Sequence, residues 1–291
     1  MKSRISSSLW FLGLSLLVAC FAVPAASPPD ALATEEGADF NILVTNDDGV
    51  YSEGIAVLAG ALSSVGNVFV VAPLENHSGA SHSLGLMSGQ VRTYPVIRND
   101  AHFGHGVKGT PVDSVLVAMY GLHPEIEFDL VVSGINNGTN AGLGSHYSGT
   151  VGAAMEGLIQ GVPAIAVSQA NDRADGYVLA ARFTARVAER VRDSGLPSRV
   201  LLSINVPAGE LAGVVARPMG GSLLKDFQLI PSIDHDGAPY LQLNAAFETE
   251  FPKGSDNEAY SEHFLTITPI QVDWTAHEML EDLNGWDLSI D

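Results

Sequence analysis

Cysteine is almost absent from this chain. Cys20 is the only one among 291 residues, so no disulfide bond can form within the chain. Basic side chains are also scarce, with 14 Lys and Arg against 33 Asp and Glu, which gives a formal net charge of −19. This balance argues against a protein that coats nucleic acid, because such proteins bind through Lys and Arg that neutralise phosphates.

Two widespread catalytic motifs are missing as well. The chain has no Gly-Lys-Ser/Thr phosphate loop and no Gly-x-Ser-x-Gly turn. His77 and His82 lie close together but lack the spacing of zinc ligands, which weakens any case for a Ser–His nucleophile. Internal repeats are absent too. The chemistry must therefore come from a different set of side chains.

The first residues have the pattern of a targeting segment. Lys2 and Arg4 are followed by an apolar stretch, Leu9 to Ala19, which is too short to span a bilayer comfortably. This pattern predicts an export signal over residues 1–25. Residues 26–39 are small and acidic, and they are predicted to form a flexible tether.

Two ends of this signal are possible. Leu17 to Cys20 is similar to the lipobox of bacterial lipoproteins, in which the Cys becomes the lipidated first residue, whereas Val23 to Ala25 suits ordinary signal peptidase. The position of the only Cys at the end of the apolar run favours the lipobox. We therefore expect an exported protein, either periplasmic or anchored to a membrane surface through Cys20.

The first polar loop of the fold follows an apolar run. Asn41 to Val44 predicts a buried strand, Asp47 and Asp48 come directly after it, and a helical pattern begins near Ile55. Strand, polar loop and helix in this order indicate an α/β fold with a mostly parallel sheet, whose ligands collect at the carboxyl ends of the strands. Paired carboxylates suit a hard cation such as Mg²⁺ or Mn²⁺. The alternative is an ordinary turn, because Asn, Asp and Gly are common turn residues.

Two more polar loops follow later strands. Asn76 to Ser78 comes after the predicted strand Val68 to Ala72, and Asn136 to Asn140 comes after the predicted strand Leu130 to Ser133. Since loops after neighbouring parallel strands share one edge of the sheet, we expect all three polar loops to face the same crevice.

A predicted helix N-terminus adds a possible anion site. Ser148, Gly149 and Thr150 precede a helical pattern over residues 152–159, and they would offer free N–H groups and hydroxyls. The alternative is a purely structural helix cap.

The α/β alternation predicts one catalytic core over residues 40–208, with a long helix over residues 174–191 near its end. From residue 209 the pattern breaks into short segments with Gly, Pro and Asp, which predicts β-hairpins or an extended arm. A last strand is predicted over residues 264–272. Residues 209–291 are thus expected to supply an arm, a closing strand and a tail that complete the same domain.

Eight short strings, in one order, carry a family resemblance. They are TNDDGV (45–50), VVAP (70–73), SGAS (78–81), GTPxD (109–113), SGINxGxN (133–140), YSGTV (147–151), AxEG (154–157) and ITP (267–269). In this order they resemble the SurE family, metal-dependent survival-protein phosphatases that act as 5′/3′-nucleotidases. The resemblance is close over residues 40–170 and looser over residues 200–275.

The resemblance implies a Rossmann-like parallel sheet flanked by helices, and hydrolysis of nucleoside 5′- or 3′-monophosphates to nucleoside and phosphate. It implies one divalent metal ion per subunit, Mg²⁺ or Mn²⁺, held by Asp47, Asp48, Ser78 and Asn136, with both aspartates catalytic. The phosphate-binding residues would be Asn140, Ser148, Gly149 and Thr150. Which carboxylate acts as base or nucleophile stays open.

The resemblance also implies a homodimer or homotetramer held together by a swapped C-terminal arm. An exported nucleotide- or phosphate-binding protein of the same fold, without catalysis, is the alternative.

Overall fold

The computed structural model describes residues 40–171, 173, 175–222, 224–288 and 290. The predicted export signal, the acidic tether and Cys20 lie outside these residues. Within the described ranges, no helix has the length and apolar character needed to cross a membrane.

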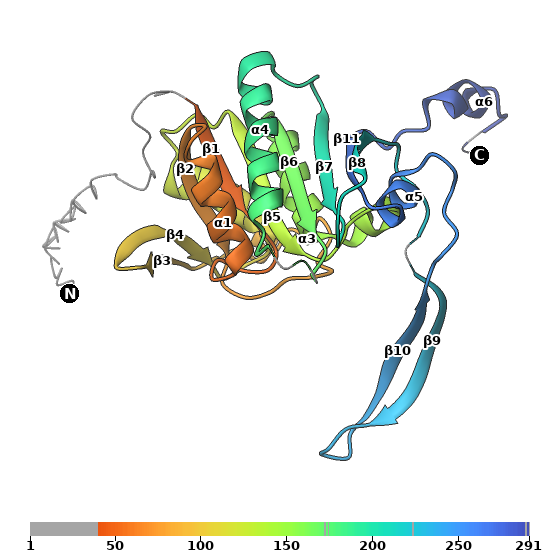
Figure 1. The fold of residues 1–291 in the computed structure, drawn as a ribbon. Helices are drawn as coiled ribbons and strands as arrows, with labels where there is room; N and C mark the ends of the chain where they lie inside the picture. The colour runs from red at the N-terminus through yellow and green to blue at the C-terminus, as the bar shows by residue number, and fades with distance from the viewer. Residues whose placement is uncertain (1–39, 172, 174, 223, 289, 291) are drawn as a thin grey trace, which may run out of the picture.

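A nine-stranded sheet forms the centre of the fold, in the order β3-β4-β2-β1-β5-β6-β7-β11-β8 (Figure 1). The strands are β1 (Asn41–Thr45), β2 (Asn67–Pro73), β3 (Thr93–Arg98), β4 (Ala101–Val107), β5 (Leu130–Asn137), β6 (Ala164–Gln169), β7 (Val200–Val206), β8 (Gly213–Ala216) and β11 (Phe264–Gln271). All neighbours from β4 to β7 pair in parallel, while β3 and β11 run antiparallel to β4 and β7. The predicted Rossmann-like α/β fold is confirmed.

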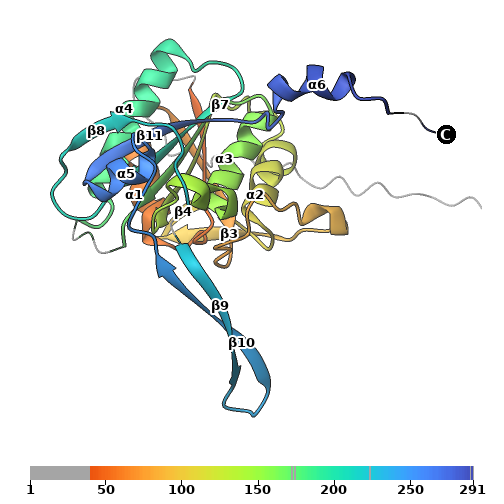
Figure 2. The same cartoon turned by 90° about the vertical axis from the view of Figure 1, so that its right-hand side faces the viewer.

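Two layers of helices cover the sheet. Helices α1 (Glu53–Leu62) and α4 (Val178–Ser194) pack on one face, and α2 (Pro111–Val117) and α3 (Gly149–Ile159) pack on the other (Figures 1 and 2). Strand β1 shows why both faces need cover: Ile42 and Val44 belong to the apolar core beneath α1 and α4, and Leu43 belongs to the core beneath α2 and α3.

Helix α4 differs from its prediction at both ends. It begins at Val178, four residues later than expected, and runs to Ser194. Gly176 and Tyr177 have φ values of +57° and +69°, so the backbone there is left-handed and cannot be part of the helix. Apolar periodicity does not reveal such a local conformation.

The order of the strands creates a crevice at the carboxyl edge. From β1 the chain moves through β2 to β4 on one side, and then through β5, β6 and β7 on the other side of β1. Strands β1 and β5 therefore lie next to each other where the direction reverses, which is the place where open α/β sheets bind ligands. The first and third polar loops leave from these two strands.

A two-stranded arm projects from this body. It consists of β9 (Leu224–Ile233) and β10 (Pro239–Phe247), which pair antiparallel and extend away from the main sheet in both views (Figures 1 and 2). The predicted hairpin is confirmed, although its strands are ten and nine residues long rather than short. Helix α5 (Asp256–Ser261) returns the chain to β11, and α6 (Leu280–Asn284) lies in the C-terminal tail.

Candidate functional site at the carboxyl edge of the sheet

The turn after β1 is made by Asn46. Its side-chain oxygen accepts the Gly49 N–H at 3.1 Å, and its amide nitrogen donates to the Gly49 carbonyl at 3.1 Å and to the Ser52 hydroxyl at 2.8 Å. An ordinary turn therefore explains why Asn46 and Gly49 occur at these positions. It leaves the carboxylates of Asp47 and Asp48 available for other contacts.

Asp48 connects the three polar loops. Its Oδ1 accepts from Nδ2 of Asn76 at 3.2 Å, and its Oδ2 accepts from the backbone N–H of Asn137 at 2.9 Å. The backbone N–H of His77 also donates to the Asp47 carbonyl at 2.7 Å. Loops that follow β1, β2 and β5 thus meet in one place, as the sequence predicts.

The other two predicted metal ligands lie on these loops. Asn136 is 8 % exposed at the end of β5, and its Nδ2 donates to the Gly138 carbonyl at 3.0 Å, which leaves the amide oxygen as its acceptor atom. The prediction placed Asn136 in a loop, whereas β5 continues through it after a register shift that follows Ser133. Ser78 is exposed, and its N–H donates to Oδ1 of Asn76 at 2.8 Å.

Both carboxylates have raised pKa values. Burial raises the pKa of Asp47 and the negative charge of Asp48 adds to the rise, against hydrogen bonds from Thr150 that lower it. Burial also raises the pKa of Asp48, against hydrogen bonds from Asn137 and Asn76. The surrounding groups do not fully compensate the negative charge of these two adjacent carboxylates. Their environment therefore favours a bound cation.

The chemistry of the donors suits a hard divalent cation. Asp47, Asp48, Ser78 and Asn136 offer carboxylate, hydroxyl and amide oxygens, the atoms that Mg²⁺ and Mn²⁺ prefer. Within the described residues, no group of three or more His, Cys, Asp and Glu side chains comes close enough to hold a metal ion. The predicted set has only two carboxylates, so it fits an ion that keeps water or phosphate oxygens as further ligands.

The N-terminus of α3 lies against Asp47. The Thr150 hydroxyl donates to Oδ1 of Asp47 at 2.5 Å, and both residues are buried. Gly149 permits this approach, because a Cβ on it would lie 2.8 Å from the Cβ of Asp47. An anion is favourable at a helix N-terminus, so the local fold both desolvates Asp47 and supports its charge.

The Thr150 hydroxyl is therefore engaged by Asp47. The phosphate-binding role that the resemblance implies for Thr150 stays a prediction. Ser148 is the N-cap of α3, since its Oγ accepts the Val151 N–H at 3.1 Å. Its O–H proton stays available as a donor.

Asn140 is held by a residue that the site prediction missed. Its backbone N–H donates to Oδ1 of Asn205 at 2.7 Å, and its Nδ2 donates to the Ser168 hydroxyl at 2.8 Å. Asn205 is fully buried near the end of β7. A polar residue that ends an apolar strand, just before Val206 and Pro207, was the available signal.

A cavity of about 880 Å³ opens beside Asn140. Its walls come from the loop between β5 and α3, which includes Tyr147, and from the arm, which contributes Phe227 and Phe247. The candidate phosphate residue Asn140 therefore lines a space large enough for a small organic molecule.

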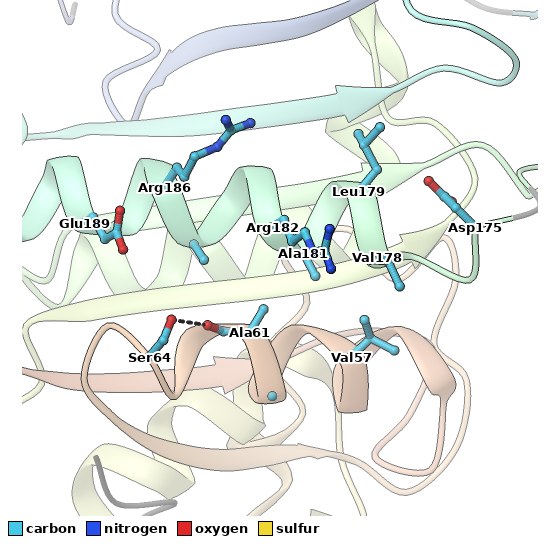
Figure 3. Close-up of a pocket in the computed structure, with 12 residues that line it drawn as sticks. Val57, Ala61, Ser64, Asp175, Val178, Leu179, Ala181, Arg182, Arg186 and Glu189 are labelled. Atoms are coloured by element: carbon cyan, nitrogen blue, oxygen red, sulfur yellow. Dashed lines mark hydrogen bonds between the residues drawn. The ribbon is translucent and has the colours of Figure 1, made fainter. Parts of the chain in front are cut away.

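Another cavity, of about 830 Å³, lies between α1 and α4 (Figure 3). Val57 and Ala61 of α1 line it opposite Arg182, Arg186 and Glu189 of α4. It contains none of the predicted site residues. The predicted site residues lie instead at the carboxyl edge of the sheet.

Comparison with known proteins agrees with the sequence resemblance. The family described as survival protein SurE matches residues 42–223. The 5′-nucleotidase SurE of Chlorobium limicola is 39% identical over 253 residues, which are 85% of this chain and 96% of that protein. Its counterpart from Chloroflexus aggregans is 40% identical over 252 residues, which are 84% of this chain and 98% of that protein.

A solved structure of the SurE protein from Aquifex aeolicus has the same fold. It aligns with a TM-score of 0.71 and 33% sequence identity, and the alignment covers 84% of this chain and 98% of that one. These similarities extend well beyond the polar loops into the C-terminal region.

Proposed function

The chain belongs to the survival protein SurE family, and from this premise we propose that it hydrolyses nucleoside monophosphates to nucleoside and inorganic phosphate. The observation that carries the proposal is the meeting of Asp47, Asp48 and the N-terminus of α3 at one edge of the sheet, with Thr150 bonded to Asp47 at 2.5 Å. Such a site combines a cation-binding pair with an anion-binding helix end.

Membership of the SurE family supports the metal dependence that the sequence resemblance implies. We propose that one divalent ion per subunit, Mg²⁺ or Mn²⁺, is held by Asp47, Asp48, Ser78 and Asn136. When bound, such an ion neutralises phosphate charge and lowers the pKa of a coordinated water. The donor oxygens described above support this assignment.

The remaining residues have roles in binding and orienting the phosphate. The N–H of Gly149 and the hydroxyl of Ser148 donate to non-bridging phosphate oxygens at the start of α3, where the helix dipole favours negative charge. Asn140 lines the neighbouring cavity, and we propose that it contacts the phosphate from that side. Asp47 and Asp48 are the groups of the set that can accept a proton from the attacking water.

The test is release of inorganic phosphate from a panel of nucleoside 5′- and 3′-monophosphates. Activity should vanish after treatment with a chelator and return when Mg²⁺ or Mn²⁺ is added. Binding of nucleotide without phosphate release, at any metal concentration, would instead establish the non-catalytic alternative. Phosphate release that survives exhaustive chelation would contradict the metal assignment alone.

We also propose that the subunits assemble into a dimer or tetramer through the arm. An isolated two-stranded hairpin is marginal in water, yet β9 and β10 expose a large apolar surface. The exposed side chains of the arm that do not line the cavity are Leu229, Ile230, Ile233, Tyr240, Leu241 and Leu243. Pairing with a neighbouring chain would cover this surface.

For its location, we propose export with lipidation at Cys20, supported by the apolar run that ends at the only Cys of the chain. Acyl chains anchor a protein because each buried CH₂ contributes about 0.8 kcal/mol. Cys20→Ser should release the protein from the membrane fraction or leave an unprocessed precursor. A mature wild-type N-terminus at Ala26, in a freely soluble protein, would overturn the anchor and leave export standing.

A further inference from the structure

The cavity beside Asn140 is walled by aromatic rings that the rest of the fold does not bury. Tyr147 is 72 % exposed, Phe227 is 60 % exposed and Phe247 is 77 % exposed. Tyr147 directly precedes Ser148, the N-cap of α3, so the chain joins the cavity wall to a predicted phosphate-binding residue. Exposed aromatic side chains that line one cavity are suited to a flat apolar ligand.

The arm is shaped locally to present its rings to this cavity. Leu224 and Phe227 both line it, although residues three apart in a regular strand face opposite sides. Lys225 pairs with Ala246 and Gln228 pairs with Asn244, so β9 holds one residue more than β10 between these pairs. A bulge of this kind turns a side chain onto the other face of its strand.

Asp226 supplies the backbone conformation for this bulge. Its φ is +54°, in the left-handed region. The result is a wall formed by Leu224 and Phe227 of β9 together with Phe247 of β10, whose register partner is Leu224.

The cavity offers no positive charge for a second phosphate. Of the described residues that line it, none has an acidic or basic side chain. Its polar groups include the hydroxyl of Thr139, the amide of Asn171 and the hydroxyl of Ser222, which suit sugar hydroxyls and base edges. A polyphosphate would bring several negative charges into this space without compensation.

We propose that this cavity binds the nucleoside of the substrate, with the base stacked on Phe227 and Phe247. It thereby selects nucleoside monophosphates over base-free sugar phosphates and inorganic polyphosphates. This proposal rests on the proposed function, since it assigns the leaving-group side of the same site. Stacking tolerates any base, because every base has a π face. The arm is then part of the substrate site as well as an assembly element.

The first test measures binding of adenosine, which needs no catalysis. Calorimetric titration of the full-length protein should show adenosine binding that weakens about tenfold in Phe247→Ala and in Phe227→Ala, and that Phe247→Tyr retains. Tyr240→Ala is the matched control, because Tyr240 is a 46 % exposed ring on the same arm and does not line the cavity. Equal affinities in the wild type and both Phe→Ala variants would overturn the proposal, as would equal losses in Tyr240→Ala.

The second test compares substrates. The ratio of kcat/KM for adenosine 5′-monophosphate to that for ribose 5-phosphate should fall about tenfold in Phe247→Ala, and wild-type hydrolysis of tripolyphosphate should be slower than that of the nucleotide. An unchanged ratio, or faster cleavage of tripolyphosphate, would contradict the nucleoside site. If adenosine binds through Phe247 but no phosphate is ever released, the proposed function fails while the nucleoside site stands.

Discussion

The carboxyl edge of the sheet and the β9–β10 arm are built on opposite principles. At the edge, Asp47 is 2 % exposed, and Thr150 and Asn205 are fully buried and joined to their neighbours by hydrogen bonds. On the arm, Phe227 and Phe247 are mostly exposed, and among the residues that the structure describes the two strands pair only with each other. The candidate catalytic residues thus lie where the fold is most constrained, and the residues proposed to recognise the substrate lie where it has no core of its own.

The difference has a physical basis. Reacting groups must be held by a rigid surrounding, which strand ends and a helix N-terminus provide. A hairpin that lacks a core is stabilised when another molecule covers its apolar side chains. We propose that a base covers them next to the main sheet and that a second chain covers them farther along the arm. The comparison therefore predicts large catalytic effects from small changes at the edge, and effects on assembly or specificity from changes in the arm.

The largest effect is expected from Asp48→Asn. It removes a charge from the candidate cation site while the amide can keep the contact with the Asn137 N–H, so the fold should persist and hydrolysis should fall by roughly 100-fold or more. Phosphate-release kinetics and circular dichroism measure the two effects. Asp236→Asn, on the exposed loop of the arm, is the control. Near-normal turnover of Asp48→Asn at saturating Mg²⁺ or Mn²⁺ would contradict the assignment of Asp48 as a metal ligand.

If the arm joins the subunits as proposed, replacing residues 224–247 by a short Gly-Ser linker should leave the protein monomeric. Gly220, Gly221 and Ser255 to Asn257 must stay, because Asp256 accepts the N–H groups of Gly142 at 2.9 Å and Gly220 at 2.7 Å and so supports the loop before α3. Light scattering gives the mass of each form. The same mass with and without the arm would contradict its role in assembly.

A smaller effect is expected at the start of α3. Ser148→Ala removes a hydroxyl donor and the N-cap, and should weaken binding of inorganic phosphate by ~1 kcal/mol, or about fivefold. Thr150→Val should lower activity through Asp47, whose hydrogen bond it removes. Inhibition by inorganic phosphate reports both changes. If neither variant alters that inhibition or the turnover, the helix end has no part in the site.

The smallest effect concerns stability without metal. The folded protein raises the pKa of Asp47 above the ordinary value of 3.8, mainly through burial, so it binds more protons there than the unfolded chain does. The contribution of Asp47 to the stability of the metal-free protein therefore falls as pH rises from about 3.8 through the raised pKa. Asp47→Asn should reduce this fall.

In a metal-stripped sample at pH 7, Asp47→Asn should gain on the order of 1 kcal/mol. Thermal unfolding between pH 4 and pH 7 measures this gain, with the exposed Asp236→Asn as reference. Adding Mg²⁺ should stabilise the wild type but not the variant. A variant less stable than the wild type at every pH would show that Asp47 is needed for the fold itself.

The same contrast explains what the sequence could predict. Asp47, Asp48 and Asn136 follow buried apolar strands, so the rule that parallel strands share an edge was enough to bring them together. The hairpin was also visible from the loss of helical periodicity after residue 209.

Other features depend on contacts that no pattern encodes. Periodicity could not reveal that Thr150 turns to Asp47, since this requires the close approach that Gly149 allows. The hydrogen bond from the Asn140 N–H to Asn205 joins residues that are 65 apart in sequence. The bulge at Asp226, which turns Phe227 to the cavity, is a local departure from strand periodicity.

The most direct test of the central claim is the anomalous scattering of Mn²⁺ in crystals soaked with Mn²⁺ and inorganic phosphate. The account predicts one manganese peak per subunit between the carboxylates of Asp47 and Asp48, with phosphate beside it over Gly149. A peak bound only by surface carboxylates elsewhere, with the Asp47–Asp48 pair empty, would contradict it.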